Sequence, residues 1–233
     1  MADLIEDAQA YVVRIDHDNG CASGVLLGNS GLVLTNYHVI RGANSLAATT
    51  VDGTWSALEV LTYDKEGDLA LLQATWPLPA LATIPLNTDA DLRLGESILV
   101  LGYPFPSSQS PNNCSESITI TRGILSGRIN ILSQELLQTD AALNPGVSGG
   151  LALTSTGVIA GMAVSGLTPD VAESVGFLIP VSAIVERLTE WLPRLAAGTL
   201  APPPILGQIA FASDRDGDSN IYVMDADGGN VRQ

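Results

Sequence analysis

The sequence predicts an all-β protein built from two six-stranded β-barrels, and three observations carry this prediction. Between residues 10 and 181, short runs of β-branched and aliphatic residues are separated by Gly, Asn, Asp and Pro, which is the pattern of sandwiches and barrels. The runs fall into two sets of six. Residues 75–94 separate the sets and contain three prolines, which suits a crossover better than another strand.

The expected strands follow one another along the chain, each bounded by turn residues and rich in side chains that fit a pleated sheet. The first barrel, at about residues 10–75, takes the runs at 11–15, 22–27, 32–35, 45–51, 55–63 and 69–73. The second barrel, at about residues 95–181, takes the runs at 97–101, 118–126, 136–138, 150–153, 158–164 and 176–179.

After Pro180 the apolar spacing changes from that of a strand to that of a helix. Residues 182–196 carry their apolar side chains on one helical face, and Ser182 is the expected N-cap. We therefore expect a closing helix over residues 182–196 and a first domain that covers residues 1–197.

The composition argues against two classes of partner. Ten Lys and Arg residues against 25 Asp and Glu residues give a formal net charge of -15, which repels the phosphates of nucleic acids and of anionic lipids. We expect a soluble protein without nucleic-acid partners. No run of about 18 apolar residues and no basic leader is present, so we expect no membrane segment and no signal peptide in the chain as given. The compartment stays open, and an extracytoplasmic one requires that a leader was removed.

Three separate motifs supply the groups of a nucleophilic centre. Ser148 lies in the glycine-rich turn 144–150, His38 in Thr-Asn-Tyr-His-Val-Ile, and Asp68 in Gly-Asp-Leu-Ala-Leu-Leu. A serine hydroxyl attacks once an imidazole takes its proton, and a carboxylate holds that imidazole in the required tautomer. Each residue alone also fits a structural role, as a histidine after a strand, a turn-capping aspartate or a loop serine.

Together, the motifs and their order resemble the trypsin-like serine proteases of the HtrA/Deg group over residues 5 to about 196. The resemblance implies a chymotrypsin-type fold with His38 as general base, Asp68 as its orienting carboxylate and Ser148 as nucleophile. It also implies an oxyanion hole made by the backbone N–H groups of Gly146 and Ser148. Glycine suits that position, because it can aim an N–H into the site without a Cβ clash. No cofactor is implied.

Two positions depart from the pattern of the group. Val147 stands where relatives usually carry Asn, and Leu151 where they carry Pro. Valine cannot hydrogen-bond to steady the oxyanion loop, and losing one oxyanion donor lowers the rate roughly 100- to 1,000-fold. Packing of the β-branched side chain is the other way to make the loop rigid. Two functions stay open: a serine endopeptidase, and a weakly active or inactive protease-fold module that recognises or regulates a partner.

Substrate preference follows from the pocket that the resemblance implies. Its floor is the residue six before the nucleophile, which is Ala142, so no carboxylate is present to bind Arg or Lys. We expect walls from residues 163–165 and 175–178, and cleavage of proteins or peptides after small or medium aliphatic residues. The expected pocket residues are Ala142, Ala163, Val164, Ser165, Gly176 and Phe177.

Three other features are expected to lie outside the chemistry. His17, between two aspartates, is expected in a solvent-exposed turn rather than as a second base. Cys21 and Cys114 belong to loops on the same side of the cleft in the resembled fold, but we expect free thiols rather than a pair. Residues 214–220 carry Asp or Asn at alternate positions, yet the glycine is misplaced for an EF-hand loop, so no calcium or other metal is expected.

A stiff linker and a second domain are expected after the closing helix. Residues 198–206 contain three consecutive prolines, which favour extended backbone. Residues 207–233 run as strand, acidic turn, strand and acidic turn, and resemble one incomplete repeat of the TolB-type β-propeller family. Because one repeat cannot bury its own faces, we expect a longer parent protein that supplies the missing propeller domain.

Overall fold

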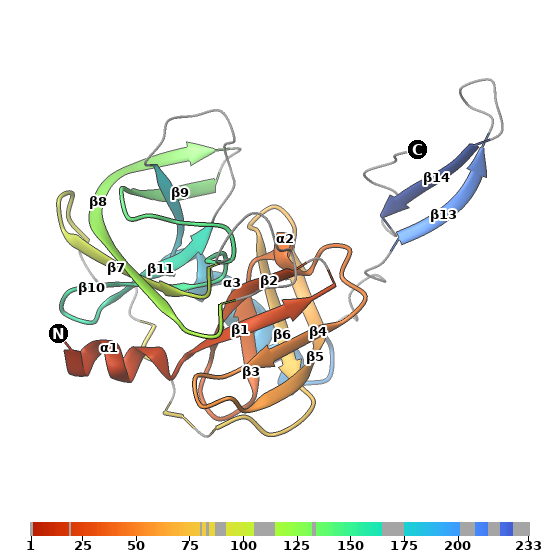
Figure 1. Ribbon diagram of the computed structural model, residues 1–233, viewed down its shortest axis with the longest axis horizontal. Helices are drawn as coiled ribbons and strands as arrows, with labels where there is room; N and C mark the ends of the chain where they lie inside the picture. The colour runs from red at the N-terminus through yellow and green to blue at the C-terminus, as the bar shows by residue number, and fades with distance from the viewer. Residues whose placement is uncertain are drawn as a thin grey trace.

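Both predicted barrels are present in a computed structural model of the chain (Figure 1). It describes residues 2–18, 20–79, 81–82, 84–86, 92–104, 115–131, 134–164 and 175–200, together with the backbone of residues 208–213 and 220–225. Each barrel is closed by six antiparallel strands, and a helix follows the second barrel. The predicted all-β double barrel with a C-terminal helix is confirmed.

The first barrel closes through the pairing of its first and fourth strands. The strand order is β1-β2-β3-β6-β5-β4, with β4 hydrogen-bonded back to β1. Its interior is filled by inward-pointing apolar side chains, among them Ile15, Leu26 and Leu72. The elements are β1 (Val12–His17), β2 (Gly20–Leu26), β3 (Leu32–Thr35), α2 (Tyr37–Ile40), β4 (Leu46–Thr49), β5 (Trp55–Asp64) and β6 (Leu69–Ala74).

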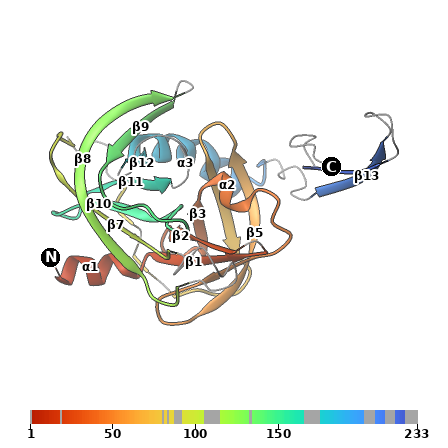
Figure 2. The ribbon, with the colours of Figure 1, turned by 45° about the horizontal axis from the view of Figure 1, so that its top comes forward.

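The second barrel has the order β10-β11-β12-β9-β8-β7, with β7 hydrogen-bonded back to β10. Its longest strand, β8, continues past the predicted end at residue 126 and forms a long hairpin with β9 (Figure 2). The strands are β7 (Ser97–Gly102), β8 (Thr119–Ile131), β9 (Gln134–Thr139), β10 (Leu151–Thr154), β11 (Ile159–Val164) and β12 (Gly176–Pro180).

Helix α3 (Val181–Ala196) packs on strands β11 and β12. The helix begins one residue earlier than expected, because Pro180, with extended backbone, takes the N-cap position without a side-chain cap. The prediction of Ser182 as N-cap was therefore wrong. A second helix, α1 (Ala2–Gln9), was not expected, and its Leu4 packs on the turn at Gly157 between β10 and β11.

One apolar cluster joins the two barrels and α3. It contains Leu34 and Leu71 from the first barrel, Leu101 and Leu153 from the second, and Trp191 from α3. The seam between the barrels is therefore part of the protein core rather than an open gap.

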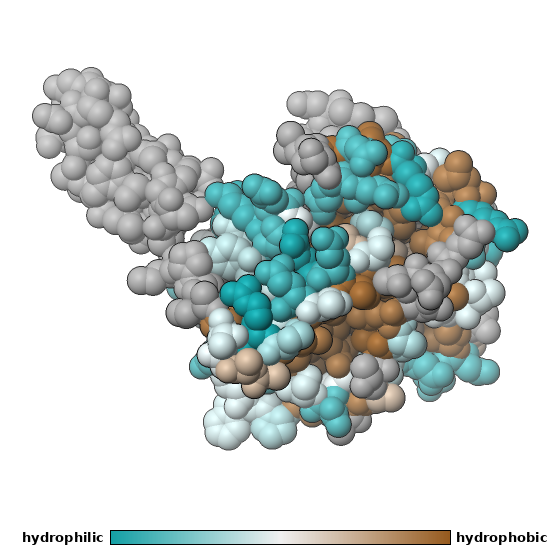
Figure 3. Space-filling model, turned by 180° about the vertical axis from the view of Figure 1, so that it is seen from behind, coloured by the Kyte–Doolittle hydropathy of each residue, from teal (hydrophilic) through white to brown (hydrophobic). Residues whose placement is uncertain are grey.

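Seen from behind, hydrophilic residues lie around a central hydrophobic area of the surface (Figure 3).

Two further strands follow α3 along the chain. β13 (Gln208–Ser213) and β14 (Asn220–Asp225) pair as an antiparallel hairpin, which Figures 1 and 2 draw apart from the barrels. Most of the expected linker lies outside the described residues.

The expectation of a free thiol at Cys21 was wrong. Cys21 is disulfide-bonded and lies buried in β2. The chain contains one other cysteine, Cys114, which lies outside the described residues.

Asp18 joins the end of β1 to the segment between α2 and β4. Its carboxylate accepts bonds from the backbone N–H groups of Asn44 and Ser45, at 2.8 and 3.0 Å, and from both of their side chains, each at 2.6 Å. Hydrogen bonds favour the ionised form, and those from Ser45 and Asn44 lower the pKa of Asp18 to about 2.

Asp18→Asn is expected to remove a pH-dependent part of the stability. The pKa of Asp18 lies below its ordinary value of 3.8 in the folded chain. The carboxylate therefore stabilises the fold above that value, and the contribution is lost as the pH falls through about 2. Urea unfolding should show a difference between parent and variant that is constant from about pH 5 to 7 and shrinks at lower pH. A difference that stays unchanged at low pH would contradict this role.

Trp191→Ala is expected to lower the free energy of unfolding by about 3–5 kcal/mol, because it empties a large buried volume under α3. Trp191 is 4% exposed, whereas the neighbouring Leu192 is 37% exposed. Leu192→Ala is the matched control on the same helix and should cost less than about 1 kcal/mol. Equal losses in denaturant titrations of the two variants would contradict the packing described for α3.

Candidate active site

The turn that carries Ser148 is held in shape by its own backbone. Val147 N–H donates to Asn144 O at 3.1 Å, and Gly150 N–H donates to Val147 O at 2.8 Å. Gly146 has a φ of 94°, a value that residues with a Cβ rarely adopt. The turn thus follows one defined path, and Ser148 lies in it with 4% of its surface exposed.

The first barrel packs directly against this turn. Gly149 is the point of contact, because a side chain there would overlap the carbonyl oxygen of Ser23 and the hydroxyl of Thr35. Ser23 N–H donates to Ser148 O at 2.8 Å, and Thr35 Oγ1 donates to Ser23 O at 2.8 Å. Since Thr35 ends the strand that leads into His38, these bonds hold residues 144–150, the expected nucleophile turn, against the histidine segment.

His38 and Asp68 are joined twice. The imidazole Nδ1 lies 2.8 Å from Oδ2, and the backbone N–H of His38 donates to Oδ1 at 2.9 Å. The carboxylate therefore orients the ring and favours the tautomer with its proton on Nδ1. Nε2 then carries the lone pair that a general base needs. The two side chains are 37% and 20% exposed, so the pair can be reached from solvent.

Asn36 holds the backbone of Asp68 in place. Asp68 has a φ of 51°, the one positive φ outside glycine in the described part of the chain, and aspartate tolerates this region better than most residues. Asn36 Nδ2 donates to Asp68 O at 3.0 Å, and the whole Asn36 side chain is buried. The residue that starts the histidine helix thereby also fixes the carboxylate.

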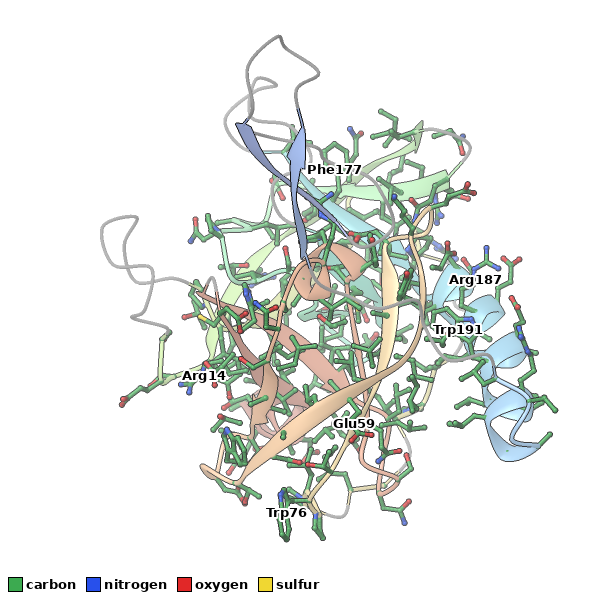
Figure 4. All side chains as sticks on the ribbon, turned by 90° about the vertical axis from the view of Figure 1, so that its right-hand side faces the viewer. Arg14, Glu59, Trp76, Phe177, Arg187 and Trp191 are labelled. Carbon is green, nitrogen blue, oxygen red and sulfur yellow. The ribbon has the colours of Figure 1, made fainter. Side chains whose placement is uncertain are left out.

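The second barrel and α3 hold the turn just before Asp68. Gln134 Nε2, from β9, donates to Gly67 O at 3.0 Å. Arg187, from α3, forms an ion pair with Asp64 at 2.6 Å, and Figure 4 shows Arg187 on the same helix as Trp191. These groups line a cavity of about 430 Å³. The position of the carboxylate therefore depends on elements outside its own barrel.

Val147 belongs to the core. Its side chain is 3% exposed and clusters with Ala141, Ala163 and Leu178. It packs against Gly102, where an added Cβ would lie 3.1 Å from Val147 Cγ1. Of the two alternatives left by the sequence, packing is therefore the one that the geometry favours for this loop.

Three of the expected pocket residues lie beside the nucleophile turn. Ala142 is exposed just before it. Ala163 lies against the turn, because Gly149 N–H donates to Ala163 O at 2.9 Å. Gly176 is close to the side chain of Leu143, since an added Cβ would lie 2.6 Å from Leu143 Cδ1. None of these three residues carries a charge.

Two other expected wall residues, Val164 and Phe177, are buried in a different apolar cluster from Ala163. Val164 and Phe177 are cross-strand partners on β11 and β12, and both belong to the cluster that joins the barrels. Their neighbours Ala163 and Leu178, also paired, belong to the cluster of Val147. Successive side chains of a strand point to opposite faces, so Val164 and Phe177 cannot share the face of Ala163. Ser165 lies outside the described residues.

His17 is a strand residue, and its expected place in a solvent-exposed turn was wrong. It ends β1, pairs with both neighbouring strands and is partly buried. Burial lowers the pKa of His17, an effect that Asp18 and Asp16 oppose and His38 reinforces.

Among the described residues, no group of three or more His, Cys, Asp or Glu side chains is arranged to hold a metal ion. The acidic residues 214–219 lie outside that part of the chain. No described helix combines the length and the apolar character needed to cross a membrane.

Sequence reasoning missed the supporting residues of this site. These residues bond to the turn of Ser148, to Asp68 or to the turn before Asp68, and they are Ser23, Asn36, Gln134 and Arg187. Only Asn36 carried a signal, since it lies within the histidine motif. The other three bond to residues that are far away in the chain, so no motif in the sequence connects them with the site.

Known proteases resemble this chain in sequence. A family model described as trypsin-like peptidase domain matches residues 22–162. Protease Do-like 1, chloroplastic, of Arabidopsis thaliana is 37% identical over 220 residues, which cover 89% of this chain and 47% of that protein. Serine endoprotease DegS of Salmonella typhimurium is 36% identical over 172 residues, which cover 68% of this chain and 44% of that protein. The chain thus spans about half the length of these curated relatives.

The fold agrees with the sequence comparison. The crystal structure of the serine endoprotease from Yersinia pestis matches with a TM-score of 0.66 at 29% identity, and the match covers 83% of this chain and 66% of that chain. The family model runs from β2 to β11 and includes His38, Asp68 and Ser148. The chain therefore belongs to the trypsin-like peptidase family, and it is similar to serine proteases of the HtrA/Deg group.

Proposed function

We propose that the chain is a serine endopeptidase that hydrolyses peptide bonds through an acyl-enzyme. The doubly bonded pair of His38 and Asp68, held against the turn of Ser148, carries the proposal. Ser148 is the nucleophile, His38 the general base and Asp68 the group that orients His38. The reaction uses no cofactor.

The reaction proceeds in two halves. His38 Nε2 takes the proton of Ser148 Oγ as the oxygen attacks the substrate carbonyl carbon, and then gives that proton to the leaving amine as the C–N bond breaks. A water molecule next attacks the acyl group on Ser148. His38 accepts a proton from this water and returns it to Ser148 Oγ, which releases the new carboxylic acid.

Backbone N–H groups of Gly146 and Ser148 stabilise the negative charge that forms on the substrate oxygen. Gly146 N–H has no intramolecular hydrogen bond within the described part of the chain, so it is available to the substrate. Preorganised donors of this kind commonly supply a large part of the rate enhancement.

A weakly active module for partner recognition is the second function that the sequence left open. This alternative was raised because position 147 carries Val instead of Asn. The burial of Val147 in the core favours the active enzyme instead, because packing restricts the same loop.

We propose that the enzyme cleaves after small or medium aliphatic residues. Ala142 places no charge on the pocket floor. Leu143 lies against Gly176, so an aliphatic side chain adjoins this proposed pocket residue. Unfolded or flexible protein segments are the substrates that offer such residues to the cleft.

We also propose that residues 1–197 form the protease domain, 198–206 a linker and 207–233 an incomplete propeller repeat. The pairing of β13 with β14, from Gln208 opposite Asp225 to Ser213 opposite Asn220, supports the strand-turn-strand pattern of such a repeat.

Ser148→Ala is expected to abolish labelling by a fluorophosphonate probe, because the probe bonds to the nucleophilic oxygen. Asp68→Asn should lower kcat by about 10⁴-fold, since an amide no longer holds the required tautomer of His38. Hydrolysis of an unfolded protein measures the second effect, and thermal unfolding checks that each variant is folded.

Labelling that persists without Ser148 would place the nucleophile elsewhere, and a folded parent that is never labelled would favour the recognition module.

Ala142→Asp is expected to raise cleavage after Arg and Lys at least about 10-fold relative to cleavage after Val, because it adds a carboxylate to the pocket floor. Ala142→Asn is the matched control, with nearly the same shape and no charge. Cleavage of a peptide library measures both variants and the parent. Dominant cleavage after Arg or Lys by the parent would contradict the aliphatic preference.

A further inference from the structure

We propose that Ser23, a residue of the first barrel, is a positioning residue for the oxyanion hole of the second barrel. The proposal rests on the proposed protease function and assigns a role to a side chain that does not touch the substrate.

Ser23 is completely buried, and each of its polar atoms has a partner. Its Oγ donates to Gly146 O at 2.9 Å and accepts from Tyr103 N–H at 2.8 Å. Its backbone N–H donates to Ser148 O at 2.8 Å, and its carbonyl accepts from Thr35 Oγ1 at 2.8 Å. One residue therefore contacts the oxyanion glycine, the nucleophile and the strand that leads into the histidine.

The direction of the Ser23 hydroxyl proton is settled by its neighbours. The backbone N–H of Tyr103 can only donate, so Ser23 Oγ accepts that bond with a lone pair. The single hydroxyl proton is left for Gly146 O. Ser23 is thus a directed donor to one carbonyl.

That carbonyl belongs to a peptide group next to the oxyanion donor. The C=O of Gly146 is held by Ser23, and the N–H on the other side of the same peptide, from Val147, is held by Asn144 O at 3.1 Å. A planar trans peptide that is bonded at both sides cannot rotate freely. Gly146 itself allows a wide range of backbone angles, so fixing the peptide that follows it removes part of this freedom and narrows the directions in which its own N–H can point.

Val147 and Ser23 complement each other at Gly102. An added Cβ at Gly102 would lie 2.9 Å from Ser23 Oγ and 3.1 Å from Val147 Cγ1. The valine fills the space, and the serine supplies the directed hydrogen bond that valine cannot make. Together they restrain the oxyanion loop without a hydrogen-bonding side chain at position 147.

Ser23→Ala is expected to lower kcat/KM roughly 10- to 100-fold through kcat, with KM changed less than about threefold, because a displaced donor acts mainly on the transition state. The inhibition constant of a peptidyl trifluoromethyl ketone, which forms a tetrahedral adduct with Ser148, should rise by the same factor. Parallel changes in kcat and in this constant are the signature of a positioning role.

Ser56→Ala is the matched control. Ser56 is equally buried and makes the same kinds of bond, since its Oγ accepts from Trp76 N–H at 3.0 Å and donates to Ala57 O at 2.9 Å. Figure 4 shows Trp76 at the end of the molecule opposite to Phe177. Ser56→Ala should cost similar stability in thermal unfolding and leave kcat/KM and the inhibition constant within about twofold of the parent.

The experiment separates the possible failures. If Ser23→Ala does not fold, Ser23→Cys, which keeps the shape and a weaker donor, is measured in its place. A folded variant whose kcat and inhibition constant match those of Ser56→Ala overturns the role of Ser23, as does a rise in KM alone. A parent that is not labelled at Ser148 overturns the proposed protease function instead.

Discussion

The contact between the two closed barrels is the constraint on which the rest of the structure depends. The imidazole and the carboxylate come from the first barrel, whereas the nucleophile turn comes from the second. An apolar cluster joins the barrels, but apolar contact is not directional and does not fix a register by itself. Hydrogen bonds across the seam, from Ser23 to Gly146 and from Gln134 to Gly67, supply the missing direction.

The double barrel could be predicted because its strands and turns are local patterns in the chain. The pocket walls show where such patterns fail. Every residue of β11 and β12 is buried, so these strands lack the alternation of apolar and polar residues that reveals which face a side chain occupies. The placement of Val164 and Phe177 in the core is therefore visible only in the folded chain.

The residues of the site also divide into those that the sequence predicts and those that only the folded chain shows. Short motifs identified His38, Asp68 and Ser148 as candidates, and the structure brings the first two into direct contact. Their supports are contacts across long stretches of chain: Ser23 and Gly146 are 123 residues apart, and so are Asp64 and Arg187. No local propensity records such a contact, because the barrels must form before the partners meet.

Gly102 links the volumes of two positions that are distant in the chain. Its missing side chain leaves the space into which Val147 and the hydroxyl of Ser23 both fit. A larger residue at position 102 needs a smaller one at position 147, and the reverse also holds. Positions 23, 102 and 147 therefore form one unit of sequence variation, in which a substitution accepted at one position depends on the residues at the other two.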